Sequence, residues 1–150
     1  MDLILWRHAE AEEGVPDEAR RLTSKGRRQA LRVGSWLRER VPGRTRLLTS
    51  PARRAQETAA AFGREAQIVA SLAPGAPARA ILQTAGWPHG NGTVIVVGHQ
   101  PDLGRAASLI LSGKEQDWNL KKGSAWWFRS KASELRMDVG LVAVVCPDVV

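Results

Sequence analysis

Residues 3–10 read Leu-Ile-Leu-Trp-Arg-His-Ala-Glu, and this stretch decides the fold class. The apolar side chains of Asp2–Trp6 run together without alternation, which predicts a short strand covered on both faces, as in a parallel sheet. The apolar run stops at Arg7 and His8. Because ligands of open parallel sheets bind at the carboxyl ends of the strands, we expect these two residues to lie at a binding edge.

A second buried strand, predicted over Thr93–Val97, has the same organisation. Gly98, His99 and Pro101 end it before a helix predicted over Leu103–Leu111. Two of the three histidines of the chain therefore follow strands directly. The third, His89, lies in a loop rich in proline and glycine, where we expect a solvated side chain.

The remaining patterns alternate between helix and strand. Thr23 or Ser24 can cap a helix whose apolar positions recur every three or four residues up to Val41, and Pro42 and Gly43 end it. The C-terminal strands have no long helix between them, which favours antiparallel pairing at one side of the sheet. The sequence thus predicts an α/β fold: a three-layer αβα sandwich with a mostly parallel central sheet and an antiparallel edge. The other predicted elements are the strand Arg46–Thr49, a helix with Pro51 in its first turn and Ala55, Ala59 and Phe62 on one side, the strand Ile68–Val69, the short helix Ala78–Ala85, and the strands Ala125–Phe128, Glu134–Met137 and Leu141–Val145.

Length and composition fit one globular domain spanning residues 1–150. The chain has 43% hydrophobic and 25% charged residues, which argues against a repeat array, a disordered tail or a disulfide-stapled miniprotein. Its single cysteine, Cys146, can form no internal disulfide, and the first ten residues lack the apolar segment of a signal peptide, so we expect a cytoplasmic location. The apolar stretch Val139–Cys146 is far shorter than the roughly 20 residues of a membrane-spanning helix.

The positive charge of the chain is unevenly placed. The net charge is +7, and residues 1–64 hold 14 basic and 8 acidic side chains, which leaves +6 in that part. Between Arg20 and Arg54 the only acid is Glu39. This surplus favours an anionic partner, and the alternative is a solvated basic face.

Four segments, in order along the chain, resemble the histidine phosphatase, or phosphoglycerate mutase-like, superfamily. An Arg-x-Leu-Thr-x-x-Gly segment and the short chain further resemble the small phosphohistidine phosphatases of the SixA type. The four segments are Leu5-Trp6-Arg7-His8-Ala9-Glu10, Arg21-Leu22-Thr23-Ser24-Lys25-Gly26-Arg27-Arg28-Gln29-Ala30, Ser50-Pro51-Ala52-Arg53-Arg54-Ala55-Gln56-Glu57-Thr58 and Val96-Val97-Gly98-His99-Gln100-Pro101.

The resemblance implies that His8 is a nucleophile that becomes phosphorylated and that Arg7, Arg54 and His99 complete a phosphate pocket. The planar guanidinium fork suits this task because it can bind two phosphate oxygens at once and keeps its charge. Nearby arginine charges also favour a neutral His8 by lowering its pKa. Arg21, before Leu-Thr, and Ser50 are expected to bind substrate, whereas Arg53 is expected at the surface. Further basic side chains are expected mostly outside the pocket, where they could steer an acidic substrate: Arg20, Lys25, Arg27 and Arg28.

The general acid of the larger family members has no counterpart in the expected place. Those members bring a carboxylate from the segment after the third strand, but residues 70–74 hold none. An alkoxide leaving group needs such a proton donor, whereas the imidazole of a phosphohistidine can carry its own proton and leave as a neutral ring. Glu10 and Asp102 remain possible general acids, and the alternative for each is a capping or loop carboxylate.

Only 40 residues separate Thr58 from His99, which leaves no room for the helical lid of larger members. The resemblance therefore implies an open site that removes phosphate from a phosphohistidine on a protein, such as a histidine-containing phosphotransfer domain, and releases inorganic phosphate. We expect no metal and no cofactor, because the two strand-end histidines lack a third ligand at a recognisable spacing.

Two alternatives stay open. One is a phosphomonoesterase that acts on a small phosphorylated molecule and uses Glu10 or Asp102 as its acid. The other is a non-enzymatic basic module that binds nucleic acid, supported by the Arg20–Arg54 charge run and six tryptophans but by no nucleic-acid-binding motif. Trp126 and Trp127 are expected to point to opposite faces of a strand.

Overall fold

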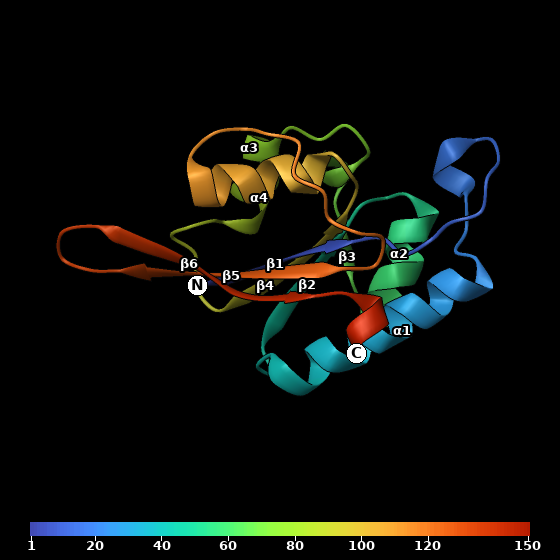
Figure 1. Ribbon diagram of the computed structural model, residues 1–150, viewed down its shortest axis with the longest axis horizontal. Helices are drawn as coiled ribbons and strands as arrows, with labels where there is room; N and C mark the ends of the chain where they lie inside the picture. The colour runs from blue at the N-terminus through green and yellow to red at the C-terminus, as the bar shows by residue number, and fades with distance from the viewer.

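The computed structural model describes residues 1–150 and places six strands in one sheet between two layers of helices (Figure 1). The strand order is β3-β2-β4-β1-β5-β6. The first four of these strands pair in parallel, and β5 and β6 pair antiparallel at one edge, which confirms the predicted α/β fold. The elements are β1 (Asp2–Arg7), η1 (Asp17–Ala19), α1 (Ser24–Arg40), β2 (Thr45–Thr49), α2 (Arg53–Ala60), β3 (Gln67–Ile68), η2 (Ala70–Leu72), α3 (Ala78–Ala85), β4 (Thr93–Gly98), α4 (Asp102–Ser112), β5 (Ala125–Ala132), β6 (Met137–Val145) and η3 (Pro147–Val149).

Two buried clusters, one on each face of the sheet, explain the unbroken apolar run of β1. Leu3 and Leu5 pack into the cluster under α3 and α4, while Ile4 and Trp6 pack into the cluster under α1 and α2. Figure 1 shows these two helix pairs on opposite sides of the sheet. Because successive side chains of a strand point to opposite faces, every residue of a central strand must be apolar when both faces are covered.

The start of α1 is fixed by a cap and by a close backbone contact. Thr23 is the cap: its Oγ1 accepts a hydrogen bond from the Gly26 amide at 2.9 Å. Gly26 is also buried against the Glu10 carbonyl, where a Cβ atom would meet the Glu10 oxygen. This contact joins α1 to the segment that follows His8.

We expect Gly26→Ala to lower the free energy of unfolding by about 2 kcal/mol, because the new methyl group collides with backbone that cannot give way easily. Urea denaturation measures the change. Gly43→Ala is the control, since a Cβ at Gly43 meets nothing within 4 Å. Equal denaturation midpoints for the two variants would contradict the expected collision.

Several predicted elements differ from those observed, and β5 and β6 are longer than the strands predicted over Ala125–Phe128 and Leu141–Val145. Pro51 precedes α2 instead of lying in its first turn. The Ser50 Oγ accepts a hydrogen bond from the Ala52 amide at 3.1 Å, and because of this turn the helix begins only at Arg53. The third strand is Gln67–Ile68, one residue earlier than predicted. Glu134–Met137 is not a separate strand: the Ser133 amide donates to the Arg136 carbonyl at 2.9 Å, so residues 133–136 form the hairpin turn between β5 and β6, and Met137 is the first residue of β6.

The tryptophans of β5 pack on both sides of the sheet, as predicted. Trp126 is half-buried beside the α3 and α4 cluster, and Trp127 is buried in the other cluster, edge-on to Trp36. The connection from α2 to β4 contains only β3, η2 and the eight-residue helix α3, so no helical lid is inserted there. No helix has both the length and the apolar character needed to cross a membrane.

Candidate active site

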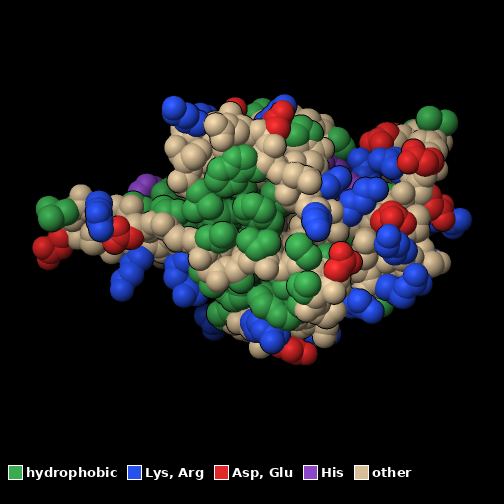
Figure 2. Space-filling view, in the orientation of Figure 1, with side chains coloured by type: hydrophobic (Ala, Val, Ile, Leu, Met, Phe, Trp, Pro, Cys, Tyr) green, Lys and Arg blue, Asp and Glu red, His purple; other side chains and the backbone are tan.

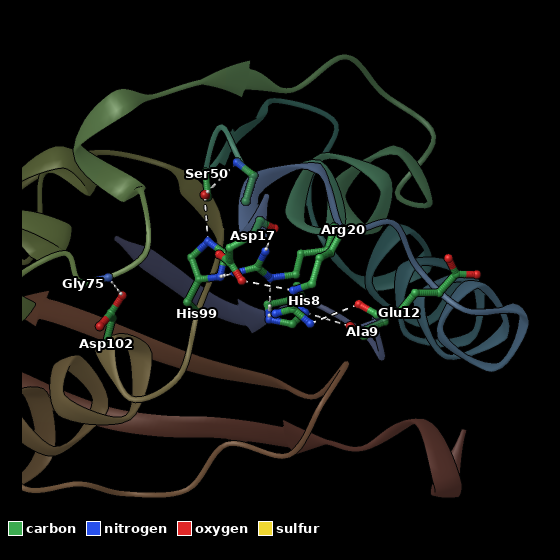
Figure 3. A network of polar contacts seen from close by, with 11 residues as sticks. His8, Ala9, Glu12, Asp17, Arg20, Ser50, Gly75, His99 and Asp102 are labelled. Atoms are coloured by element: carbon green, nitrogen blue, oxygen red, sulfur yellow. Dashed lines mark hydrogen bonds and ion pairs between the residues drawn. The ribbon is translucent and has the colours of Figure 1, made fainter. Parts of the chain in front are cut away.

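Two histidines and an arginine meet at the carboxyl ends of the central strands. His8 follows β1, His99 follows β4, and Arg54 lies in the first turn of α2. Because β1 and β4 are neighbours, with Arg7 opposite Gly98, the two imidazole rings come to 5.2 Å between their centroids. Figure 3 shows the side chains of His8 and His99 turned into the same small space.

The His8 ring is held in one protonation pattern. Its Nδ1 lies 2.7 Å from the Ala9 carbonyl oxygen, which can only accept, so Nδ1 carries the proton. The lone pair of Nε2 then accepts a hydrogen bond from the Nε of Arg54 at 3.3 Å. Burial, together with the charges of Arg54 and Arg7, lowers the pKa of His8 to about 4 against the opposing effect of the Ala9 hydrogen bond. At neutral pH, Nε2 is therefore an unprotonated nitrogen.

His99 is supported from behind by Ser50. Its Nε2 lies 2.7 Å from the Ser50 hydroxyl, and its Nδ1 lies 3.4 Å from a terminal nitrogen of Arg54. Burial, together with the charge of Arg54, lowers the pKa of His99 to about 3. Ser50 is fully buried, so the structure places it behind His99 and not at the surface of the site, where a substrate-binding residue was expected.

The two arginines of the site are anchored differently. Arg7 donates from Nη1 to the Leu120 carbonyl at 2.7 Å, and its buried Nε has no hydrogen-bond partner. Arg54 is buried and donates from Nη1 to the Asp17 carbonyl at 2.8 Å and from Nη2 to the Asp17 carboxylate at 3.0 Å. A buried guanidinium donor without a partner is costly unless a ligand oxygen supplies the missing bond.

The side chains of Arg7, His8, Arg54 and His99 line one cavity of about 450 Å³. Its walls are mostly polar, and basic residues outnumber acidic ones. The structure contains no group of three or more His, Cys, Asp or Glu side chains placed to hold a metal ion. The charged and imidazole side chains of the lining are Arg7, His8, Glu13, Arg20, Arg54, His99, Asp102, Arg105 and Lys122.

Arg20 lines the cavity and Arg21 does not, contrary to expectation. Arg20 donates from Nε to Asp17 at 3.0 Å and lies close enough to lower the pKa of His8. Arg21 is exposed and pairs with Glu12 at 3.0 Å, away from the cavity. In the Arg-x-Leu-Thr spacing, Arg20 is the first arginine and Arg21 the variable position, so the motif already contained the signal that identifies Arg20.

Of the two possible general acids, only Asp102 faces the cavity. Glu10 accepts a hydrogen bond from the Thr23 hydroxyl at 3.0 Å and lies at the start of α1. Asp102 is buried at the start of α4, accepts the Gly75 amide at 2.9 Å, and has its pKa raised by burial. Arg53 is exposed and pairs with Glu57 at 2.8 Å, and His89 is exposed, as expected for both.

The depressed pKa values of His8 and His99 predict that the fold loses stability in mild acid. Below pH 6.5 the unfolded chain protonates both rings, whereas the folded protein keeps them neutral down to about pH 4 and about pH 3. The free energy of unfolding should therefore fall as pH drops from about 6.5 to 4, by up to about 1.4 kcal/mol per pH unit for each histidine. Urea denaturation between pH 7.5 and 5 measures this slope, and His8→Asn should make it shallower. An unchanged slope in that variant would contradict a neutral buried His8.

The model of the Histidine phosphatase superfamily (branch 1) matches residues 3–75, a range that holds Arg7, His8 and Arg54. The chain is similar to the histidine phosphatase superfamily in this range. This similarity supports phosphatase activity. No curated protein sequence matches the chain.

Solved structures of the superfamily share the whole fold. A provisionally named phosphohistidine phosphatase SixA from Nakamurella multipartitia is 28% identical, with a TM-score of 0.76 over 97% of this chain and 95% of that one. The protein histidine phosphatase SixA in complex with tungstate is 21% identical, with a TM-score of 0.81 over 99% and 98% of the two chains. A phosphoserine phosphatase from Entamoeba histolytica is 18% identical, with a TM-score of 0.68 and 95% coverage of both chains. The small phosphoglycerate mutase-like fold of this chain is thus of the SixA type.

Proposed function

We propose that residues 1–150 form one catalytic unit that removes phosphate from a phosphohistidine on a protein, through a phosphorylated His8. The observation that carries this proposal is the state of His8: a neutral ring with its Nε2 lone pair turned toward Arg54 in a cavity lined by Arg7, Arg20 and His99. A nucleophile and preorganised positive donors are the two requirements of phosphoryl transfer. The proposed setting is the cytoplasm.

The proposed reaction has two steps. First, His8 Nε2 forms a bond to phosphorus while the phosphorus–nitrogen bond to the substrate imidazole breaks, and that imidazole leaves as a neutral ring with the proton on its other nitrogen. Second, water attacks the phosphorus of phosphorylated His8, which returns the ring to its starting state and releases inorganic phosphate. Arg7, Arg54 and His99 would bind the equatorial oxygens, where charge spreads in the transition state. Ser50 would hold His99 in place through the 2.7 Å contact.

Three observations support a protein phosphohistidine as substrate. Three SixA structures, all named as histidine or phosphohistidine phosphatases, share this fold over nearly the whole chain. No inserted lid covers the cavity, so a side chain on a folded partner can reach His8. Basic side chains surround the site, including Arg20, Arg105 and Lys122. Figure 2 shows many Lys and Arg side chains, with Asp and Glu among them, at the end of the molecule that carries α1, α2 and η1. Such a surface suits an acidic partner and speeds its approach at low salt.

A phosphomonoesterase is the second candidate, and Asp102 is the observation that favours it. This carboxyl is buried, faces the cavity and has a raised pKa, which are the properties of a proton donor for an alkoxide leaving group. A phosphohistidine substrate would not need that proton. Asp102→Asn therefore separates the two candidates, because it should lower ester cleavage alone.

The test measures phosphate release from a phosphohistidyl protein and from an aryl phosphate, for the unaltered protein and for Asp102→Asn, with and without EDTA. The proposal expects faster release from phosphohistidine, no effect of EDTA and less than about a twofold effect of Asp102→Asn on that substrate, because removing a general acid costs roughly 10²–10⁴-fold only where one is needed. Faster ester cleavage that falls in Asp102→Asn would select the phosphomonoesterase. Loss of phosphohistidine cleavage in EDTA would overturn the metal-independent mechanism.

A further inference from the structure

Arg54 has almost all of its hydrogen bonds in the protein itself. Its Nε and one Nη2 hydrogen go to His8 and His99, and its remaining contacts are the Asp17 carbonyl and the Asp17 carboxylate. Guanidinium has five N–H donors, so four are engaged without any ligand. A phosphate that binds this arginine through two oxygens must take over donors that the protein already uses.

The Asp17 carboxylate is the acid that pairs with Arg54. Its Oδ2 lies 3.0 Å from Arg54 Nη2, and its Oδ1 lies 3.0 Å from Arg20 Nε. One carboxylate therefore bridges two arginines of the candidate site. Figure 3 shows Asp17 close to His8, His99 and Arg20.

Asp17 is also free to withdraw from this place. Its side chain is 57% exposed, while that of Arg54 is 5% exposed. It lies on the single-turn element η1, in the long connection between β1 and α1. A rotation of the side chain would release Arg54 toward the cavity, and the Arg20 side chain, 21% exposed and bound to the Glu12 carbonyl at 3.1 Å, would stay in place to pair with it.

We infer that Asp17 is an internal competitor of phosphate: its carboxylate occupies Arg54 in the free protein, is displaced when a phosphoryl group binds, and returns to help expel inorganic phosphate. The inference rests on the proposed function, because it takes phosphate as the ligand of the cavity. The buried Arg54 charge needs an anion in every state, and the carboxylate supplies one whenever phosphate is absent. Exchange between the Asp17 carboxylate and phosphate keeps the Arg54 charge neutralised in both states. The competition weakens the binding of phosphate and so limits inhibition by this product.

The test is the dissociation constant of inorganic phosphate, measured by calorimetry at neutral pH. Asp17→Asn should bind phosphate about three- to tenfold more tightly than the unaltered protein, because the contact it removes is a charged but half-exposed pair. Glu13→Gln is the matched control, since Glu13 is an exposed carboxylate lining the same cavity without a hydrogen bond to Arg54. It removes the same charge and should change the affinity by less than twofold. Asp17→Glu keeps a carboxylate and should restore the weak binding.

Each outcome decides a different point. Equal or weaker phosphate binding in folded Asp17→Asn, judged by an unchanged circular dichroism spectrum, would overturn the competitor role and make Asp17 an orienting partner of Arg54. An equal gain in Glu13→Gln would also overturn it, because general electrostatics would then explain the effect. Arg54→Gln tests the proposed function separately: if it binds phosphate as well as the unaltered protein does, phosphate does not bind at Arg54 at all.

Discussion

Replacing His8 by asparagine is expected to lower phosphatase turnover by about 10⁴-fold or more, because the change removes the only proposed nucleophile. Asparagine is the informative substitution. Its amide N–H can replace the Nδ1 bond to the Ala9 carbonyl, whereas no lone pair takes the place of Nε2. The His8 ring is neutral in the fold, so its removal leaves no buried counter-charge unpaired.

Two measurements check the role of His8. Turnover is followed by phosphate release, and the intermediate is followed by rapid quenching at high pH, where phosphohistidine survives, after mixing with a radiolabelled phosphohistidyl protein. Labelled enzyme should accumulate in the unaltered protein and be absent in His8→Asn. His89→Asn is the control, because His89 is an exposed histidine far from the cavity lining. Label retained in His8→Asn would place the nucleophile elsewhere, with His99 the next residue to test.

Replacing Arg54 by glutamine is expected to lower kcat/KM by about 10³-fold, in the range found when a preorganised donor to a transferring phosphoryl group is lost. Arg54 contacts both histidines, so one substitution removes a phosphate ligand and frees the orientation of both rings. Arg54→Lys should recover little, since an ammonium cannot donate to His8, His99 and a phosphate oxygen in one plane.

The neighbouring arginine provides the control. Arg53→Gln removes the same charge from the adjacent position, but this side chain is exposed and pairs with Glu57. We expect kcat/KM within about threefold of the unaltered value, since exposed ion pairs contribute about 0–1 kcal/mol. Comparable losses in the two variants would mean that the charge of this helix end matters and the geometry of Arg54 does not.

The central sheet could be predicted because its sequence signals are local. The β1 and β4 runs, the Thr23 cap and the helix Ala78–Ala85 depend on burial and chain geometry within a few residues, and the structure reproduces them. The C-terminal hairpin is harder to predict from the sequence. Gly140 interrupts the apolar pattern of β6, and a glycine in a strand reads as a break in sequence although pairing with β5 keeps the strand continuous.

In the candidate site, too, some residues can be predicted from local sequence signals and others depend on how the chain folds. His8, His99 and Arg54 follow from strand ends and a motif, because a parallel sheet gathers the ends of its strands. Asp17 could not be predicted from the sequence, because its contact with Arg54 depends on how the long β1–α1 connection folds back onto α2. No periodic pattern in the sequence predicts the path of that connection. Arg20 and Arg21 differ by one position: the Arg-x-Leu-Thr spacing singles out Arg20, and the folded loop turns Arg20 inward while Arg21 stays exposed.

Some residues that line the cavity lie at strand ends and others lie in the segments around the sheet, and this difference has an evolutionary consequence. Arg7, His8 and His99 are fixed directly at strand ends, whereas Arg20, Arg105 and Lys122 come from the β1–α1 connection, from α4 and from the segment before β5. Those outer segments lie outside the paired residues of β1 and β4, so insertions and charge changes there need not alter the register of these strands. Under the proposed function, a lineage that inherits this scaffold can change its substrate by altering the outer segments, while the residues proposed to bind the phosphoryl group keep their spacing.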